Sequence, residues 1–372
     1  MTSLPLLRAT DDAEARGDAM GALEIIERHL DDGRADDFWR PARLTRLSQL
    51  SVFRSVLPRW ATSRWILDQA AQCLDDRGRH RARRAMEIAV ATRGGASTLV
   101  GHDRADALAK VIDHDWVYRQ VLLYDLGALE GFLARTATPD LVAGADRIRE
   151  WARTPLSAFR LVTETPRTLA WRELATGREV TAINIGSNSL VLPDECAIGR
   201  LVPIEEGGAM FETVPLYVPD DVALRVAEQP AEWLAAVADG CRPDRPPQDR
   251  MSTRGHHFRL LTDVPLVIQH RNVRAVLEAF GRLSEEEIDA DPIAAQTAFV
   301  RVALENELEA DEGWASPWPS VGAALMSPAV FHEVGEGLSR DDAPGLDRLA
   351  GLLASPADEV CRLFALSLRG AA

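Results

Sequence analysis

The clearest chemical signal in the sequence is an arginine-rich segment, residues 40–93, which also holds tryptophans. It contains 12 arginines against only four acidic residues. Guanidinium groups pair with phosphates and aromatic rings stack on bases, so this combination is typical of a surface that binds nucleic acid or a nucleotide. Arginines at i, i+4 and i+7 share one face of a helix. The candidate binding residues are Trp60, Arg64, Trp65, Arg77, Arg81 and Arg84.

The same segment also has a structural interpretation. Trp60, Trp65 and Ile66 are spaced as on a buried helical face. Residues 284–372 hold 17 acidic residues and five arginines, so this acidic region is suited to pack against the basic segment, within one chain or across a dimer. We expect this packing role first, and we keep an anionic protein partner and a nucleic acid as the alternatives.

A second group of side chains has the types that bind divalent metals. His102, Asp106 and Asp113 follow one another at i, i+4 and i+11, near one polar face of a predicted helix. The pair His102-Asp103 resembles the motif of HD-type phosphohydrolases, and this resemblance implies a metal-dependent hydrolase. That family also needs an upstream histidine, which His80 would supply, and a distant aspartate, which nothing in the sequence identifies. We therefore expect a solvated helix face without a metal, and we keep the hydrolase as an alternative.

Motifs of catalytic sites are missing from the sequence. It contains no GxSxG nucleophile elbow, no GxGxxG loop and no HExxH zinc motif. A Walker loop needs a lysine, and the only lysine, Lys110, lies within a predicted helix. We therefore predict no catalytic residues and no cofactor. The leading hypothesis is a non-enzymatic interaction or scaffold protein that binds a protein partner or a second copy of itself.

Composition and charge narrow the class of protein. Of the 372 residues, 46% are hydrophobic and 27% are charged, which excludes collagen-like, disulfide-rich and wholly disordered chains. The net charge of −15 disfavours a general nucleic-acid coat and a binder of anionic membranes. Residues 1–155 are neutral, and the whole deficit lies in residues 156–372. The argument against anionic partners therefore does not extend to the basic segment.

We expect the protein to be cytoplasmic. The first ten residues lack the basic and apolar parts of a signal peptide, and no window of 18 residues is uninterruptedly apolar. The cysteines are more than forty residues apart, so they form no CxxC pair for zinc or redox chemistry. Reduced thiols are the expectation for all four, Cys73, Cys196, Cys241 and Cys361.

The elements that carry these residues divide the chain into three regions. Residues 1–155 are predicted to be helical, residues 156–219 to form a small antiparallel β module, and residues 220–372 to be mainly helical with a proline-rich linker near 241–255. The predicted class is α+β, mostly α. Strands are expected at 159–165, 168–174, 178–185, 196–204 and 209–218. The N-terminal helices are expected at 22–30, 40–56, 60–75, 79–92, 103–116, 118–135 and 139–152.

Several helix starts are encoded locally. Thr138-Pro139, Ser327-Pro328 and Ser355-Pro356 each combine a capping residue with a proline in the first turn. The segment from Ser284 to Glu287 predicts a capping box, in which the serine and the glutamate each bind a backbone amide at the helix start. Residues 257–270 are expected to hold two short strands, broken at Pro265.

Residues 159–162, 171–180 and 199–203 resemble a small β module of uncharacterised bacterial proteins of the SEC-C-associated type. Residues 60–70 resemble the helical part of similar actinobacterial proteins. The SEC-C motif itself needs clustered cysteines, which this chain lacks, so the metal site and partner docking of that motif are not implied. The resemblance implies a layout of helices beside a β module, and no activity.

Overall fold

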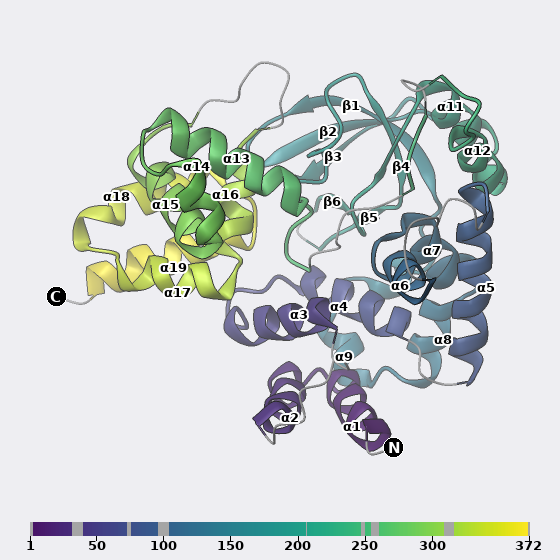
Figure 1. The fold of residues 1–372 in the computed structure, drawn as a ribbon, viewed down its shortest axis with the longest axis horizontal. Coiled ribbons are helices and arrows are strands. Elements are labelled where there is room, and N and C mark those ends of the chain that lie inside the picture. The colour runs from purple at the N-terminus through teal and green to yellow at the C-terminus, as the bar shows by residue number, and fades with distance from the viewer. Residues whose placement is uncertain are drawn as a thin grey trace.

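The computed structural model describes residues 3–31, 40–72, 76–95, 104–205, 207–246, 250–253, 260–308 and 316–370. Figure 1 shows a β-sheet flanked on one side by the N-terminal helices and on another by the C-terminal helices. The predicted class, α+β and mostly α, is confirmed. In these ranges no helix is long and apolar enough to cross a membrane.

Helices make up most of the first region. Two predicted helices are interrupted: the run 118–135 passes through a π-helical turn, Val121–Asp125, and breaks at Gly127, whose φ of +66° suits a residue without a Cβ. The run 139–152 breaks where Arg147 takes a φ of +46°. The first helix, α1, was not predicted. The helices are α1 (Ser3–Ala15), α2 (Ala19–Asp31), α3 (Pro41–Val52), α4 (Arg59–Gln72), α5 (Asp76–Thr92), α6 (Arg104–His114), α7 (Trp116–Gln120), α8 (Ala128–Arg135), α9 (Pro139–Gly144) and α10 (Ile148–Trp151).

The strands lie in one sheet with the order β5-β6-β3-β2-β1-β4-β7. Their bounds are β1 (Ser157–Glu164), β2 (Thr168–Glu173), β3 (Glu179–Ile183), β4 (Cys196–Gly199), β5 (Leu201–Pro203), β6 (Ala209–Phe211) and β7 (Leu216–Val218). The predicted module is antiparallel except for one pair: β3 and β6 run parallel, with Ala182 opposite Ala209. The predicted strand 196–204 is two strands, because the chain leaves β1 after Gly199 and joins β6 from Leu201. The predicted strand 209–218 is also two strands, because β6 pairs with β5 whereas β7 pairs with β4.

The sheet curls so that its two ends approach each other. Strand β4 lies near one end of the strand order and β5 at the other, yet only Arg200 separates them in the chain. Inside the curl, Phe211 packs edge-to-face against Phe159 and Trp171, with ring centroids 5.4 and 5.1 Å apart. A Cβ on Gly199 would lie 2.9 Å from the Phe211 ring, so a glycine is needed where the chain turns from β4. The β module therefore has its own aromatic core, as small barrels do.

The third region forms two groups of helices. α11 (Asp220–Glu228) and α12 (Trp233–Gly240) pack beside the sheet and α5, and share a core with them. The remaining helices gather on the other side of the sheet (Figure 1). They are α13 (Leu266–Ala279), α14 (Glu285–Ala290), α15 (Pro292–Glu305), α16 (Trp318–Leu325), α17 (Pro328–Glu336), α18 (Ala343–Leu352) and α19 (Ala357–Gly370).

The first and third regions share one continuous hydrophobic core. Phe53, just after α3, packs edge-to-face on Phe331 of α17 with centroids 5.1 Å apart. The Gln49 side chain donates to the carbonyl oxygen of Met326 at 2.9 Å. These contacts join residues nearly 300 positions apart, so the early and late helices stabilise each other.

The local helix signals are mostly confirmed. Thr138 caps α9 through Leu141 N, and Ser284 and Glu287 form the capping box of α14. Helix α17 begins at Pro328 as predicted, but the Ser327 side chain makes no capping hydrogen bond. The two strands expected over 257–270 are wrong for residues 266–270, which begin α13, because Pro265 occupies the N-cap with an extended backbone. Residues 257–259 lie outside the described ranges, as do 247–249 and 254–255 of the predicted linker.

Candidate functional site

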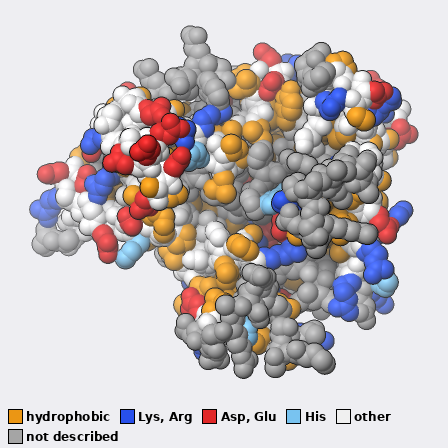
Figure 2. Space-filling model, in the orientation of Figure 1, with side chains coloured by type: hydrophobic (Ala, Val, Ile, Leu, Met, Phe, Trp, Pro, Cys, Tyr) orange, Lys and Arg blue, Asp and Glu red, His pale blue; other side chains and the backbone are white. Residues whose placement is uncertain are grey.

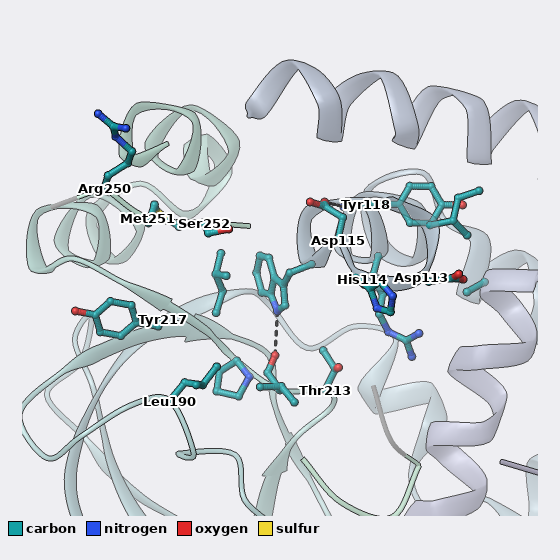
Figure 3. A pocket seen from close by; sticks show the side chains of 17 residues that line it. Asp113, His114, Asp115, Tyr118, Leu190, Thr213, Tyr217, Arg250, Met251 and Ser252 are labelled. Carbon is teal, nitrogen blue, oxygen red and sulfur yellow. Dashed lines mark hydrogen bonds between the residues drawn. The ribbon is translucent and has the colours of Figure 1, made fainter. Parts of the chain in front are cut away.

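A cavity of about 330 Å³ lies where the N-terminal helices meet the β module (Figure 3). One wall comes from the end of α6 and from α7, and the opposite wall from the segment between β6 and β7 together with Leu190. Residues 250–252 close a third side. The lining residues are Ala71, Ile112, Asp113, His114, Asp115, Trp116, Tyr118, Arg119, Leu190, Thr213, Val214, Pro215, Leu216, Tyr217, Arg250, Met251 and Ser252.

Asp115 holds the helical wall in place. It sits between α6 and α7 and caps α7, since its Oδ1 accepts from Tyr118 N at 2.7 Å. Its Oδ2 accepts from the Thr253 hydroxyl at 2.8 Å and forms an ion pair with Arg93. Burial raises the pKa of Asp115, and the Arg93 guanidinium opposes this rise. One buried carboxylate therefore links Arg93, directly after α5, with α7 and the segment that follows Arg250.

Trp116 joins the helical wall to the sheet wall. Its backbone N donates to the Thr253 carbonyl at 3.1 Å, and its indole Nε1 donates to the Val214 carbonyl at 3.1 Å. Its ring also packs edge-to-face on Trp233 of α12, with centroids 5.8 Å apart. In Figure 3, Leu190, Thr213 and Tyr217 lie across the cavity from Asp113, His114 and Tyr118. The three sides are thus tied to one another by hydrogen bonds through one residue.

The lining contains two carboxylates, Asp113 and Asp115, and two guanidinium groups, Arg119 and Arg250. Asp113 pairs with Arg40, and Asp115 with Arg93, so arginines outside the lining neutralise both carboxylates. Arg119 donates to Asp68 Oδ1 at 2.8 Å, but Asp68 also accepts from Arg46. The Arg250 guanidinium donates to the carbonyl oxygens of Pro243 and Arg245. Burial lowers the pKa of His114, so its imidazole is neutral at pH 7. The guanidinium groups of Arg119 and Arg250 therefore lie in the lining beside two carboxylates that are paired with arginines outside it.

A buried polar network lies behind the pocket. Glu212 Oε1 accepts from Gln120 Nε2 at 2.5 Å, and Gln120 Oε1 accepts from Arg200 Nε at 3.0 Å. The Arg200 guanidinium stacks 3.9 Å from the centroid of the Tyr124 ring. Burial raises the pKa of Glu212 despite the nearby guanidinium of Arg119. These residues do not line the pocket, but their neighbours Arg119 and Thr213 do, so the network positions both walls.

Three of the predicted binding residues are core residues. Arg64 is fully buried and pairs with Asp263, and Trp60 packs 5.5 Å from its guanidinium. Trp65 is buried and donates its indole N–H to Glu14 Oε2 at 2.8 Å. These three side chains are therefore not available to stack or pair with a nucleic acid at the surface.

The other three predicted binding residues lie on α5, away from the pocket. Arg77 and Arg84 are exposed and Arg81 is half-buried. Arg84 pairs with Glu87 at 3.2 Å. The structure therefore does not bring the six predicted residues together on one surface.

In the part of the chain that the structure describes, the ion pairs of the basic segment involve acidic residues outside 284–372. Its arginines at 40, 43, 46, 59, 64, 84 and 93 pair with acidic groups, of which Asp68 and Glu87 lie within the segment itself. These partners are Asp11, Glu14, Asp68, Glu87, Asp113, Asp115, Glu205 and Asp263. The basic segment does pack against the C-terminal region, through the apolar contact of Phe53 with Phe331, but the acidic partners of these arginines lie outside residues 284–372.

The predicted metal ligands are not assembled in the part of the chain that the structure describes. His102 lies outside it, as does the side chain of Asp106, and Asp113 pairs with Arg40 at the pocket. Within the described residues, no group of three or more histidine, cysteine or acidic side chains is placed to hold a metal. The cavity itself was not predicted, because its walls come from segments that are distant in the sequence, such as those of Trp116 and Val214.

Comparisons with protein-family models, with curated proteins and with solved structures found no match. The pocket is therefore interpreted from its own residues. The resemblance of residues 159–162, 171–180 and 199–203 to proteins of the SEC-C-associated type stays a prediction.

Proposed function

We propose that this protein binds, without catalysis, a small molecule that has an apolar body and an acidic group. The observation that carries the proposal is the cavity of about 330 Å³ with three walls joined by hydrogen bonds. Pockets for small ligands in proteins have volumes of roughly 300–1,000 Å³, are mostly apolar and are usually formed before the ligand arrives. This cavity has the size, lining and fixed walls of such a site.

The lining indicates the chemistry of the ligand. Large apolar and aromatic side chains surround most of the space: Ile112, Trp116, Leu190, Pro215, Leu216, Tyr217 and Met251. Their burial against a flat apolar body supplies affinity. The guanidinium groups of Arg119 and Arg250 are the lining groups that an anionic group of the ligand would pair with.

The described thiols support a binding role without catalysis. Burial raises the pKa of Cys196 to about 12, that of Cys241 to about 11 and that of Cys361 to about 12. These thiols therefore stay protonated at pH 7 and are poor nucleophiles. Free thiols are also typical of the cytoplasmic location that forms part of this proposal.

An interaction or scaffold role toward a protein partner or a second copy stays a prediction. The pocket does not depend on it, since its walls come from a single chain. Anion binding through the α5 arginines is a separate question, because Arg77, Arg81 and Arg84 do not line the pocket.

Binding of anilinonaphthalene sulfonate, which has flat apolar rings and one anionic group, tests the proposal. The mouth residue Leu190 is 38% exposed, and Leu192, two residues on, is 37% exposed but does not line the pocket. The variant L190W fills the mouth, and L192W is its matched control. Titration calorimetry should give one site per chain, with affinity about tenfold weaker in L190W and within twofold of the parent in L192W. Absence of a saturable site, or equal weakening in both variants, contradicts the proposal.

A further inference from the structure

Two guanidinium groups from different helices meet above Gly131 of α8. A Cβ added to Gly131 would lie 2.8 Å from Arg81 Nη1 and 2.7 Å from Arg135 Nη2. Arg81 extends from α5, and Arg135 from the last turn of α8 itself. Gly131 is buried although Arg135 is exposed, because the two side chains cover it. Because Gly131 has no side chain, the guanidinium groups of Arg81 and Arg135 can both occupy the space above it.

This convergence is not balanced by carboxylates. Among the residues that the structure describes, neither the Arg81 nor the Arg135 side chain forms an ion pair or a hydrogen bond. Many other arginines of the basic segment do have acidic partners, including Arg84 with Glu87. Two unit charges this close repel by roughly 1 kcal/mol even in a medium like water. An anion between the two groups would turn this repulsion into attraction.

We propose that Arg81 and Arg135 form a binding site for a single phosphate group, with Gly131 as its floor. Guanidinium groups bind phosphate oxygens through two parallel N–H donors, and two such groups match the several oxygens of one phosphate. Arg77 stands one turn before Arg81 on the same helix and extends the positive surface. In Figure 2, Lys and Arg side chains gather beside a histidine at the side of the molecule where Figure 1 places the lower part of α5.

The geometry favours a phosphate monoester or inorganic phosphate over a nucleic acid. The paired guanidinium groups define one point above one glycine, whereas a nucleic acid needs a row of phosphate contacts. The aromatic residues that stacking would need, Trp60 and Trp65, are buried in the core. This site is independent of the cavity near Trp116, since none of its three residues lines that cavity.

Titration calorimetry with inorganic phosphate tests the proposal on the whole chain. The variants R81Q and R135Q should each weaken phosphate binding by about tenfold or more. G131A should also weaken phosphate binding by about tenfold or more, because its Cβ occupies the space between the two guanidinium groups. The substitution should not disrupt α8, because alanine favours a helix more than glycine does. The control R84Q removes one positive charge from the same helix as R81Q, but Arg84 pairs with Glu87 and is not one of the two proposed phosphate ligands. Its affinity for phosphate should therefore stay within about twofold of the parent's.

The competing outcome is a diffuse basic surface that binds nucleic acid. It is tested by titrating a short DNA duplex at two salt concentrations, because binding through many phosphates weakens steeply with salt. Duplex binding that R81Q and R84Q weaken equally, without saturable phosphate binding, overturns the proposal. So does phosphate binding that G131A leaves unchanged. L190W should leave phosphate binding intact, so the failure of this site and that of the cavity are distinguishable.

Discussion

Arg64 of α4 and Asp263 form a two-point ion pair in which both side chains are fully buried. Nη1 lies 2.8 Å from Oδ1 and Nη2 lies 3.0 Å from Oδ2. Nη2 also donates to the Phe211 carbonyl at 2.7 Å, and the Ser187 hydroxyl donates to Asp263 Oδ2 at 2.6 Å. The pair therefore joins an N-terminal helix, the β module and the chain that leads into α13.

Removal of one partner of this pair should destabilise the whole protein. In R64M the Asp263 carboxylate keeps its burial and loses its counter-charge, which costs about 3–5 kcal/mol. Urea unfolding measures this as a drop in the unfolding free energy. The double variant R64M/D263L should recover part of the loss, because it leaves no buried charge. A loss below about 1 kcal/mol in R64M would show that the pair does not join the three parts.

The variant E212Q should make the protein less sensitive to alkaline pH. Burial raises the pKa of Glu212 above its ordinary value of 4.5 in the folded state. The stability that depends on the protonated carboxyl is therefore complete below the unfolded pKa, and it is lost as pH rises through the folded pKa. Glutamine stays neutral at every pH and its carbonyl can still accept from Gln120. Urea unfolding should show that the unfolding free energy of E212Q, relative to that of the parent, is higher at pH 8 than at pH 5. The same difference between the two proteins at both pH values would refute this.

Thr253 should contribute both to the unfolding free energy of the protein and to the position of the pocket wall near Met251. Its hydroxyl donates to Asp115 at 2.8 Å and accepts from Arg93 Nε at 2.8 Å. T253V leaves buried polar groups without these bonds, so we expect a loss of about 1–3 kcal/mol in thermal or urea unfolding. Anilinonaphthalene sulfonate should also bind more weakly, because the segment near Met251 is released. The control T176V removes an exposed hydroxyl, and its effect should stay within about 0.5 kcal/mol. Equal effects of the two variants would contradict the role of Thr253.

Two glycines of α18 should respond to alanine in opposite ways. A Cβ on Gly345 would lie 2.5 Å from the backbone oxygen of Leu304, which cannot move aside easily because Arg348 binds that same oxygen. G345A should therefore lose about 1–3 kcal/mol of unfolding free energy. A Cβ on Gly351 meets nothing within 4 Å, so G351A should be neutral or gain up to about 1 kcal/mol. Similar melting temperatures for the two variants would show that α15 and α18 can separate at little cost.

Elements specified by neighbouring residues were predicted well from the sequence. The cap of α9 at Thr138 and the capping box of α14 at Ser284 follow from residues three positions apart. Strands β1 to β3 pair in sequence order across short turns, with Arg172 opposite Glu179, so their hydrophobic pattern was sufficient to locate them. Each of these features depends on contacts within a few residues or across one hairpin.

Features that depend on distant partners were not predicted. Arg64 and Arg81 look alike in the sequence, but Arg64 lies in the core because Asp263, 199 residues later, neutralises it there. The single strand expected over 196–204 is two strands, since the residues after Arg200 pair with β6 at the other end of the sheet order. Nothing near these residues in the sequence encodes such partners.

The sequence by itself determined the class of the fold, most helix starts and the positions of the first strands, because backbone propensity and capping act over one or two turns. Only the tertiary structure decided which arginines are buried, that Arg81 and Arg135 come together above Gly131, and that Trp116 binds the segment after β6 at the wall of a cavity. The physical reason is that burial, charge pairing and cavities arise from contacts between elements. A pattern along the chain specifies which face of an element is apolar, but not which other element will cover it.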